Sequence, residues 1–149
     1  MTGVDYNSQS IAYAKEQLSD FKNVSLVNKP INTYLNSLED HSVDIIFTSA
    51  TLFYCSQKDL EGLFEQLQRK TKKLIIFETV DSRFPFFKNT SSALQPNQFA
   101  YTHDYPQKLI NGGFQLETVN FAPIWLNAYD TGESALRNNI CSLLIVAHT

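Results

Sequence analysis

Several features that commonly reveal a function are missing from these 149 residues. The chain has only five glycines, and none of them forms the GxGxG pattern of a phosphate-binding loop. Its two cysteines, Cys55 and Cys141, have no CxxC pattern and no histidine companion. This argues against a zinc or disulfide framework and favours a reducing, cytoplasmic compartment. No Ser-His-Asp, metal or P-loop constellation is present.

Charge and long apolar runs are also scarce. The formal net charge is -3 and no basic run occurs, which argues against a nucleic-acid-binding surface. Every apolar run is far shorter than a membrane span, and the N-terminus lacks the basic and apolar regions of a signal peptide. Hydrophobic residues make up 43% and charged residues 18%, so we expect one globular domain over residues 1–149.

Residues 43–54 are the centre of the predicted fold. Val43 to Phe47 is a short apolar run, which predicts a strand buried on both faces in the middle of a parallel sheet. The small residues Ser49, Ala50 and Thr51 follow, and small side chains at the carboxyl end of a parallel strand leave room for a ligand. An ordinary buried strand followed by a loop is the alternative interpretation.

A second candidate site lies at the N-terminus. Residues 2–4 are interpreted as the tail of a strand that ends at Asp5, and Asn7 or Ser8 can cap the helix that follows. A carboxylate at such a strand end can accept hydrogen bonds from two ribose hydroxyls. The alternative is that Asp5 only caps the turn.

Strands and helices alternate along the rest of the chain. Strands are predicted at residues 23–28, 73–79, 114–121 and 140–147, and helices near Pro30, Ser56 and Asp104. This alternation predicts a parallel α/β sheet. The last two strands are too close in sequence for a full crossover helix, so we expect them to be antiparallel. The long segments 80–103 and 122–139 leave strands at the ligand edge. Long irregular loops are usually functional or disordered, and residues 80–103 are too aromatic for disorder.

This order of elements resembles the class I S-adenosylmethionine-dependent methyltransferases. The matching residues are Gly3-Val4-Asp5, Asn23 to Val27, Val43 to Ile46, Leu74 to Glu78, Gly112-Gly113-Phe114 and the last strand. The resemblance implies an α/β fold: a Rossmann-like, mostly parallel sheet flanked by helices, with an antiparallel last strand. That antiparallel end distinguishes the pattern from a nicotinamide-binding Rossmann domain.

The chain departs from the family at its start. It begins at the family's second strand, without the first strand and the glycine-rich loop. Asn28-Lys29-Pro30 stands where the family often has an acidic residue. The missing strand would leave two unpaired strand edges. These edges could close on each other or bind a second copy in a homo-oligomer, but we expect instead that Met1 is a truncated or misassigned start.

The resemblance also implies methyl transfer from S-adenosylmethionine to a small or medium organic acceptor, with no metal. Asp5 would bind the ribose, Tyr6 would lie along the adenosine, and the adenine would be bordered by Asn28, Lys29 and Ile31. Ser49, Ala50 and Thr51 would line the floor beneath the sulfonium, in the same crevice as Asp5. His103 is the best candidate base, and the alternative, which the sequence favours, is a loop residue ahead of the Asp104 cap. The predicted acceptor pocket consists of Tyr54, Phe84, Phe86, Phe87, Tyr101, Trp125 and Tyr129, whose alternative role is a hydrophobic plug.

Two other functions remain open. One is a non-catalytic, methyltransferase-like interaction module that oligomerises through its strand edges. The other is a nicotinamide oxidoreductase, against which the absent phosphate loop and the antiparallel end both count.

Overall fold

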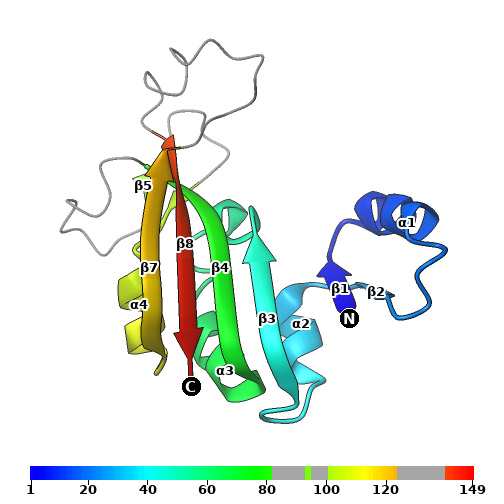
Figure 1. Ribbon diagram of the computed structural model, residues 1–149, viewed down its shortest axis with the longest axis horizontal. Helices are drawn as coiled ribbons and strands as arrows, with labels where there is room; N and C mark the ends of the chain where they lie inside the picture. Colours follow the sequence, from blue (N-terminus) through cyan, green and yellow to red (C-terminus); the bar gives the residue numbers. More distant parts are fainter. Residues whose placement is uncertain (82–92, 95–100, 124–139) are drawn as a thin grey trace. The chain divides into compact units, whose positions relative to one another are not determined.

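The computed structural model describes the backbone of residues 1–81, 93–94, 101–123 and 140–149 (Figure 1). The chain divides into two compact units, Met1–Asp40 and His41–Thr149, and each unit is described by itself. One domain over residues 1–149 therefore stays a prediction.

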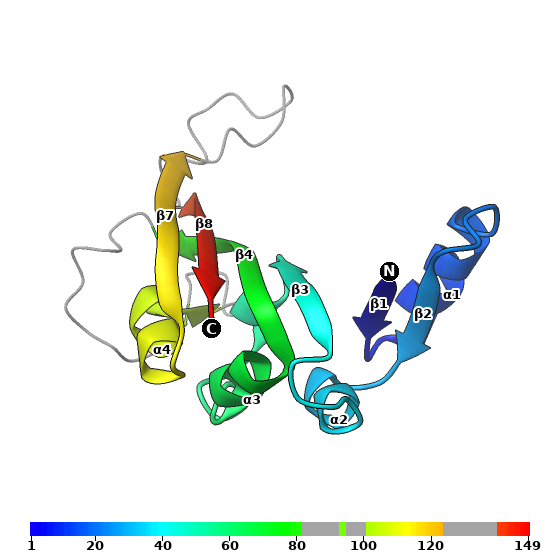
Figure 2. The same cartoon turned by 60° about the horizontal axis from the view of Figure 1, so that its bottom comes forward.

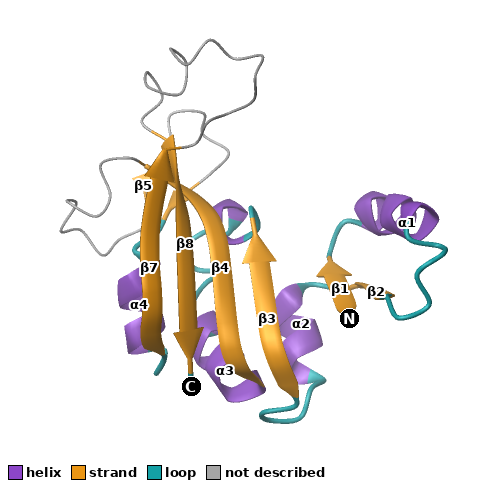
Figure 3. Ribbon diagram, viewed as in Figure 1, coloured by secondary structure: helices purple, strands orange, loops and turns teal. Residues whose placement is uncertain are grey.

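The N-terminal unit has the order strand, helix, strand, helix (Figure 3). Strands β1 and β2 pair in parallel with Asp5 opposite Asn28, so their carboxyl ends lie side by side. Asn7 caps the first helix, as predicted, because its Oδ1 accepts hydrogen bonds from the N–H groups of Gln9 at 2.9 Å and Ser10 at 3.2 Å. The elements are β1 (Thr2–Asp5), α1 (Ser8–Gln17), β2 (Ser25–Asn28) and α2 (Ile31–Asn36).

The larger unit is built on a sheet of order β3-β4-β8-β7. Strand β3 is parallel to β4, whereas β8 is antiparallel to both β4 and β7. This arrangement confirms the predicted Rossmann-like fold with an antiparallel last strand. The elements are β3 (Val43–Ser49), the 3-10 helix η1 (Leu52–Tyr54), α3 (Leu63–Lys70), β4 (Thr71–Asp81), β5 (Ala93–Leu94), β6 (Tyr101–Thr102), α4 (Tyr105–Asn111), β7 (Gln115–Pro123) and β8 (Ile140–His148).

Helices α3 and α4 lie on the same side of this sheet (Figure 2). The side chains between the helices and the sheet form the core, and its strand residues alternate as expected for one buried face. The fully buried members on β4 and β8 are Leu74, Ile76, Val80, Leu143, Ile145 and Ala147. Leu63 and Leu67 of α3 and Leu109 of α4 are buried as well. This face is therefore the hydrophobic core of the larger unit.

The opposite face corrects one prediction. Strand β3 was expected to be buried on both faces, yet Ile45 is 56% exposed and Phe47 is 61% exposed. Phe77 of β4, on the same face, is also exposed. The prediction was wrong because β3 ends the described sheet and the described helices of this unit cover only one side of it. An apolar run alone does not distinguish a central strand from an edge strand.

The helix expected from Ser56 begins later. The predicted capping box does form, since Ser56 N–H donates to Asp59 Oδ2 at 2.8 Å and Asp59 N–H donates to Ser56 Oγ at 3.3 Å. However, Gly62 has a φ of +69°, a left-handed conformation that interrupts the helix, so α3 starts at Leu63. The predicted apolar stripe of Leu60, Leu63, Phe64 and Leu67 is buried all the same.

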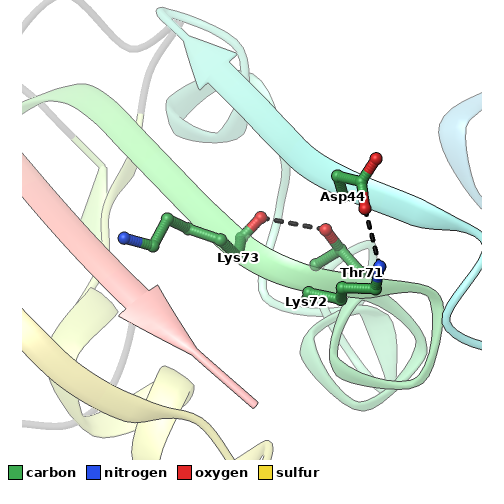
Figure 4. Close-up of polar contacts among 4 residues, drawn as sticks. All are labelled: Asp44, Thr71, Lys72 and Lys73. Atoms are coloured by element: carbon green, nitrogen blue, oxygen red, sulfur yellow. Dashed lines mark hydrogen bonds and ion pairs between the residues drawn. The ribbon is translucent and has the colours of Figure 1, made fainter.

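Polar contacts secure the amino end of β4 (Figure 4). Lys72 Nζ lies 2.7 Å from Asp44 Oδ1 on β3, and the Thr71 hydroxyl donates to the carbonyl oxygen of Lys73 at 2.9 Å. Lys73 Nζ in turn lies 2.9 Å from Glu117 Oε2 on β7. These lysines lower the pKa of the Asp44 and Glu117 carboxyls through hydrogen bonding and charge. Both pairs are solvent-exposed and make small contributions to stability.

The strands at the ends of the described sheets have open edges, and β1 and β3 are among them. Strand β1 pairs only with β2, and β3 pairs only with β4. Such edges present unpaired backbone groups that can accept a further strand. In the described part of the chain, no helix is long and apolar enough to cross a membrane.

Candidate functional site

A turn of three small residues follows β3, in the position predicted for cofactor binding. Ser49, Ala50 and Thr51 are all exposed. Ala50 has a φ of +48°, a left-handed conformation that is unfavourable for residues other than glycine. Its N–H donates to the carbonyl oxygen of Phe77 at 3.1 Å, and the Thr51 hydroxyl donates to the carbonyl oxygen of Ser49 at 2.9 Å. Backbone conformations of this kind cluster at functional sites.

Glu78 of β4 binds the same turn through hydrogen bonds. It was not among the predicted site residues. Its side chain is buried, and its carboxylate accepts hydrogen bonds from three consecutive N–H groups, those of Thr51, Leu52 and Phe53. Burial raises the pKa of Glu78, while these N–H groups oppose the rise by stabilising the ionised form. The available signal was a glutamate at the end of an otherwise apolar strand, since a buried carboxylate needs partners.

His103, the predicted base, is completely buried. Its Nε2 lies 2.8 Å from the carbonyl oxygen of Cys55, and because a carbonyl can only accept, Nε2 carries the hydrogen. Burial lowers the pKa of His103 to about 4, so the ring is neutral at physiological pH. Its role as a base stays a prediction, and a buried ring whose Nε2 is already engaged counts against that role.

Two further titratable groups lie beside this histidine. The ring of Tyr105 meets that of His103 edge-on, with ring centroids 5.4 Å apart, and its hydroxyl is buried without a hydrogen-bond partner among the described residues. Burial raises the pKa of Tyr105 well above its usual range and that of Cys55 to about 11. Both groups are therefore neutral at physiological pH. The described residues contain no group of three or more His, Cys, Asp or Glu that could hold a metal ion.

In the N-terminal unit, Asp5 lies at the end of the parallel pair, as predicted. Its Oδ1 accepts a hydrogen bond from the N–H of Asn7 at 2.7 Å, so the carboxylate does cap the turn. The backbone carbonyl of Asp5 accepts hydrogen bonds from Asn28 Nδ2 at 3.0 Å and from the N–H of Lys29 at 3.1 Å. The structure thus brings together three of the predicted cofactor-binding residues, whose contacts with a cofactor stay predictions.

The two other residues predicted to bind adenosine flank this strand end. Tyr6 comes directly after Asp5 and is 79% exposed. Ile31 is the first residue of α2 and is half-buried. An exposed ring and a partly exposed aliphatic side chain leave apolar surface available for a flat ligand group.

The predicted acceptor residues are described only in part. Tyr54 is 62% exposed, and its ring centroid lies 4.0 Å from that of Phe53. Tyr101 is half-buried and stacks on His103, with centroids 5.9 Å apart. The remaining members, Phe84, Phe86, Phe87, Trp125 and Tyr129, lie outside the described residues. The pocket formed by these aromatic residues stays a prediction, as does the alternative of a plug.

Comparison with known families gives one match, which covers most of the chain. Residues 1–123 match the model of a family described as a methyltransferase domain. No curated protein sequence matches the chain.

Comparison with solved structures identifies the same fold. The geranyl diphosphate C-methyltransferase of Streptomyces coelicolor A3(2) is 13% identical with a TM-score of 0.72, and the match covers 99% of this chain and 64% of that protein. A methyltransferase from Methanosarcina mazei is 17% identical with a TM-score of 0.68, at 99% and 81% coverage. The cyclase SpnF is 11% identical with a TM-score of 0.70, at 99% and 65% coverage. At these identities the similarity concerns the fold, and the chain spans about two thirds of the first of these proteins.

Proposed function

Because this chain belongs to the methyltransferase domain family, we propose that it binds S-adenosylmethionine and transfers its methyl group to a small or medium organic acceptor. The observation that carries the proposal is the exposed turn at the carboxyl end of β3. Ser49, Ala50 and Thr51 have small, exposed side chains there, and Ala50 has a left-handed backbone conformation. The carboxyl ends of strands are where open α/β sheets bind their ligands.

Asp5 is proposed to bind the ribose of the cofactor. Its hydrogen bond with the N–H of Asn7 occupies one lone pair of Oδ1, and an ionised carboxylate has about four acceptor sites. The carboxylate can therefore cap its turn and accept ribose hydroxyls together. The two interpretations of Asp5 that the sequence left open are compatible.

The bound cofactor would supply an electrophilic methyl group attached to a sulfonium, so the protein contributes mainly binding and orientation. Holding donor and acceptor in line is a large part of catalysis in such displacements. A general base is needed only where the acceptor must lose a proton. The buried, neutral His103 is consistent with an acceptor that does not need one.

The acceptor is proposed to be a small organic molecule with an apolar part. Tyr54 and Tyr101 offer exposed or half-exposed aromatic surface in the larger unit, and Phe84, Phe86, Phe87, Trp125 and Tyr129 would extend it. One of the solved structures with the same fold is a geranyl diphosphate C-methyltransferase, and geranyl diphosphate has an apolar chain. The fold itself does not fix the reaction, since the cyclase SpnF shares it.

Titration calorimetry on the full chain tests cofactor binding. We expect S-adenosylmethionine and S-adenosylhomocysteine to bind and NAD to give no heat. Asp5→Asn should weaken the binding of both compounds about tenfold or more, because a charged acceptor of hydrogen bonds is lost. Asp20→Asn, an exposed acidic residue of the same unit, is the matched control and should leave both affinities unchanged. Absence of binding by the wild-type chain would refute the proposal.

The second candidate is a non-catalytic interaction module. The open edges of β1 and β3 favour it, because exposed strand edges promote association between chains. Light scattering coupled to size exclusion would then give a mass of at least two chains, and neither cofactor would bind. A monomer that binds S-adenosylhomocysteine rules this candidate out.

A further inference from the structure

We infer that Glu78 makes the turn after β3 selective for a cationic ligand group over a neutral or anionic one. The inference rests on the proposed function and concerns the charge of the cofactor at this turn. The three consecutive N–H groups of residues 51–53 all donate hydrogen bonds to the carboxylate of Glu78.

Both oxygens of Glu78 take part in this contact. Thr51 N–H lies 3.1 Å from Oε1 and 3.0 Å from Oε2, Leu52 N–H lies 3.1 Å from Oε1, and Phe53 N–H lies 3.4 Å from Oε2. Successive N–H groups that converge in this way form a concave site for anions. Here the chain fills that site with its own carboxylate, so these N–H groups are not available to a phosphate.

Strand β4 also fixes the shape of the turn. Two consecutive β4 residues hold it, because the carbonyl of Phe77 accepts the N–H of Ala50 at 3.1 Å and the side chain of Glu78 accepts the next three N–H groups. Ala50 keeps its left-handed φ of +48° between these anchors. A conformation this unfavourable persists only when the surrounding structure determines it.

The negative charge is placed where it acts strongly on a ligand. Glu78 is 2% exposed, whereas Thr51, whose N–H it accepts, is exposed, as are the neighbouring Ser49 and Ala50. A buried charge is little screened by solvent, so it interacts over a longer distance than a surface carboxylate does. A sulfonium at this turn would be stabilised, and a neutral thioether or a phosphate would not.

Burying a carboxylate to stabilise a turn also carries a large desolvation penalty. Removing an ion from water costs several kcal/mol before its hydrogen bonds compensate, and apolar packing often stabilises a protein equally well. Neighbouring groups do not neutralise the charge, because Tyr105, Cys55 and His103 are all uncharged near pH 7. The charge itself is therefore the feature that a neutral residue could not supply.

The test compares the affinities of S-adenosylmethionine, which carries a sulfonium, and S-adenosylhomocysteine, which carries a neutral thioether. Calorimetry on the full chain gives both dissociation constants for the wild type, Glu78→Gln, Glu78→Asp and the exposed control Glu61→Gln. Glu78→Gln should weaken the binding of S-adenosylmethionine about tenfold and that of S-adenosylhomocysteine less than about threefold. Glu78→Asp retains the charge and should preserve the ratio of the two constants, even where a shorter side chain weakens both. Glu61→Gln should change neither.

Each result decides a different claim. An unchanged ratio in a folded Glu78→Gln variant, as judged by circular dichroism, overturns the charge-selecting role while leaving cofactor binding intact. A wild-type chain that binds neither compound refutes the proposed function, and the inference with it. If Glu78→Gln fails to fold, the two dissociation constants of the wild type decide the question. The wild type should bind S-adenosylmethionine more tightly than S-adenosylhomocysteine, and equal affinities overturn the inference.

Discussion

The Nε2 of His103 lies 2.8 Å from the carbonyl oxygen of Cys55, and the ring is fully buried. This contact joins the residue ahead of the N-cap of α4 to the residue that follows η1. It fixes the tautomer of the ring, because a carbonyl can only accept a hydrogen bond. The histidine that the sequence offered as a base therefore serves at least as a structural link.

Acid should destabilise the protein through His103. The unfolded histidine titrates near pH 6.5 and the folded one near pH 4, so between these values the unfolded state binds more protons and stability falls as pH falls. We expect a loss of about 2 kcal/mol from pH 7 to pH 5, measured by urea unfolding. His103→Asn should remove this part of the pH dependence. An identical pH slope in the variant would show that another group is responsible.

Glu78, in contrast, should make the folded protein more stable as the pH falls. Its pKa is raised in the folded state, so above the ordinary pKa of a glutamate the folded protein holds its proton more tightly than the unfolded chain. As the pH falls from 8 to 5, the free energy of unfolding of the wild type should therefore rise relative to that of Glu78→Gln. Glu61→Gln is the control. A shift towards the variant on acidification would contradict the raised pKa.

The two faces of the sheet should differ sharply in their response to truncation. Leu67 on α3 is fully buried, and Leu67→Ala should lower the free energy of unfolding by about 2–5 kcal/mol. Ile45→Ala on the exposed face of β3 should lower it by less than about 1 kcal/mol. Both values come from urea denaturation. Equal losses would mean that the outer face of β3 is covered in solution.

Gly112 is expected to resist substitution because of close packing. A Cβ added there would lie 2.8 Å from Cβ of Phe64 and 3.1 Å from its carbonyl carbon. Gly112→Ala should therefore destabilise the chain by about 1–3 kcal/mol in thermal or urea unfolding. Gly3→Ala is a useful comparison, since its Cβ would meet only the flexible end of Leu26, also at 2.8 Å. A larger effect at Gly3 than at Gly112 would contradict this packing argument.

The sequence predicted most elements because their signals are local. The helix caps at Asn7 and Asp104 and the final strand all formed as expected. The delayed start of α3 at Gly62 was missed, because a capping box does not reveal a left-handed glycine six residues later. Glu78 was missed for a different reason: its partners in residues 51–53 lie far away in sequence and are backbone atoms, which carry no sequence signature.

By itself, the sequence determined the order of strands and helices, the antiparallel last strand and the small residues at the end of β3, because periodicity, capping and side-chain size are written residue by residue. Only the tertiary structure decided which face of β3 is exposed and that His103 is buried and neutral. It alone decided that a carboxylate from β4 holds the turn after β3. Burial and electrostatics depend on what packs against a residue, and that is set by elements far apart in the chain.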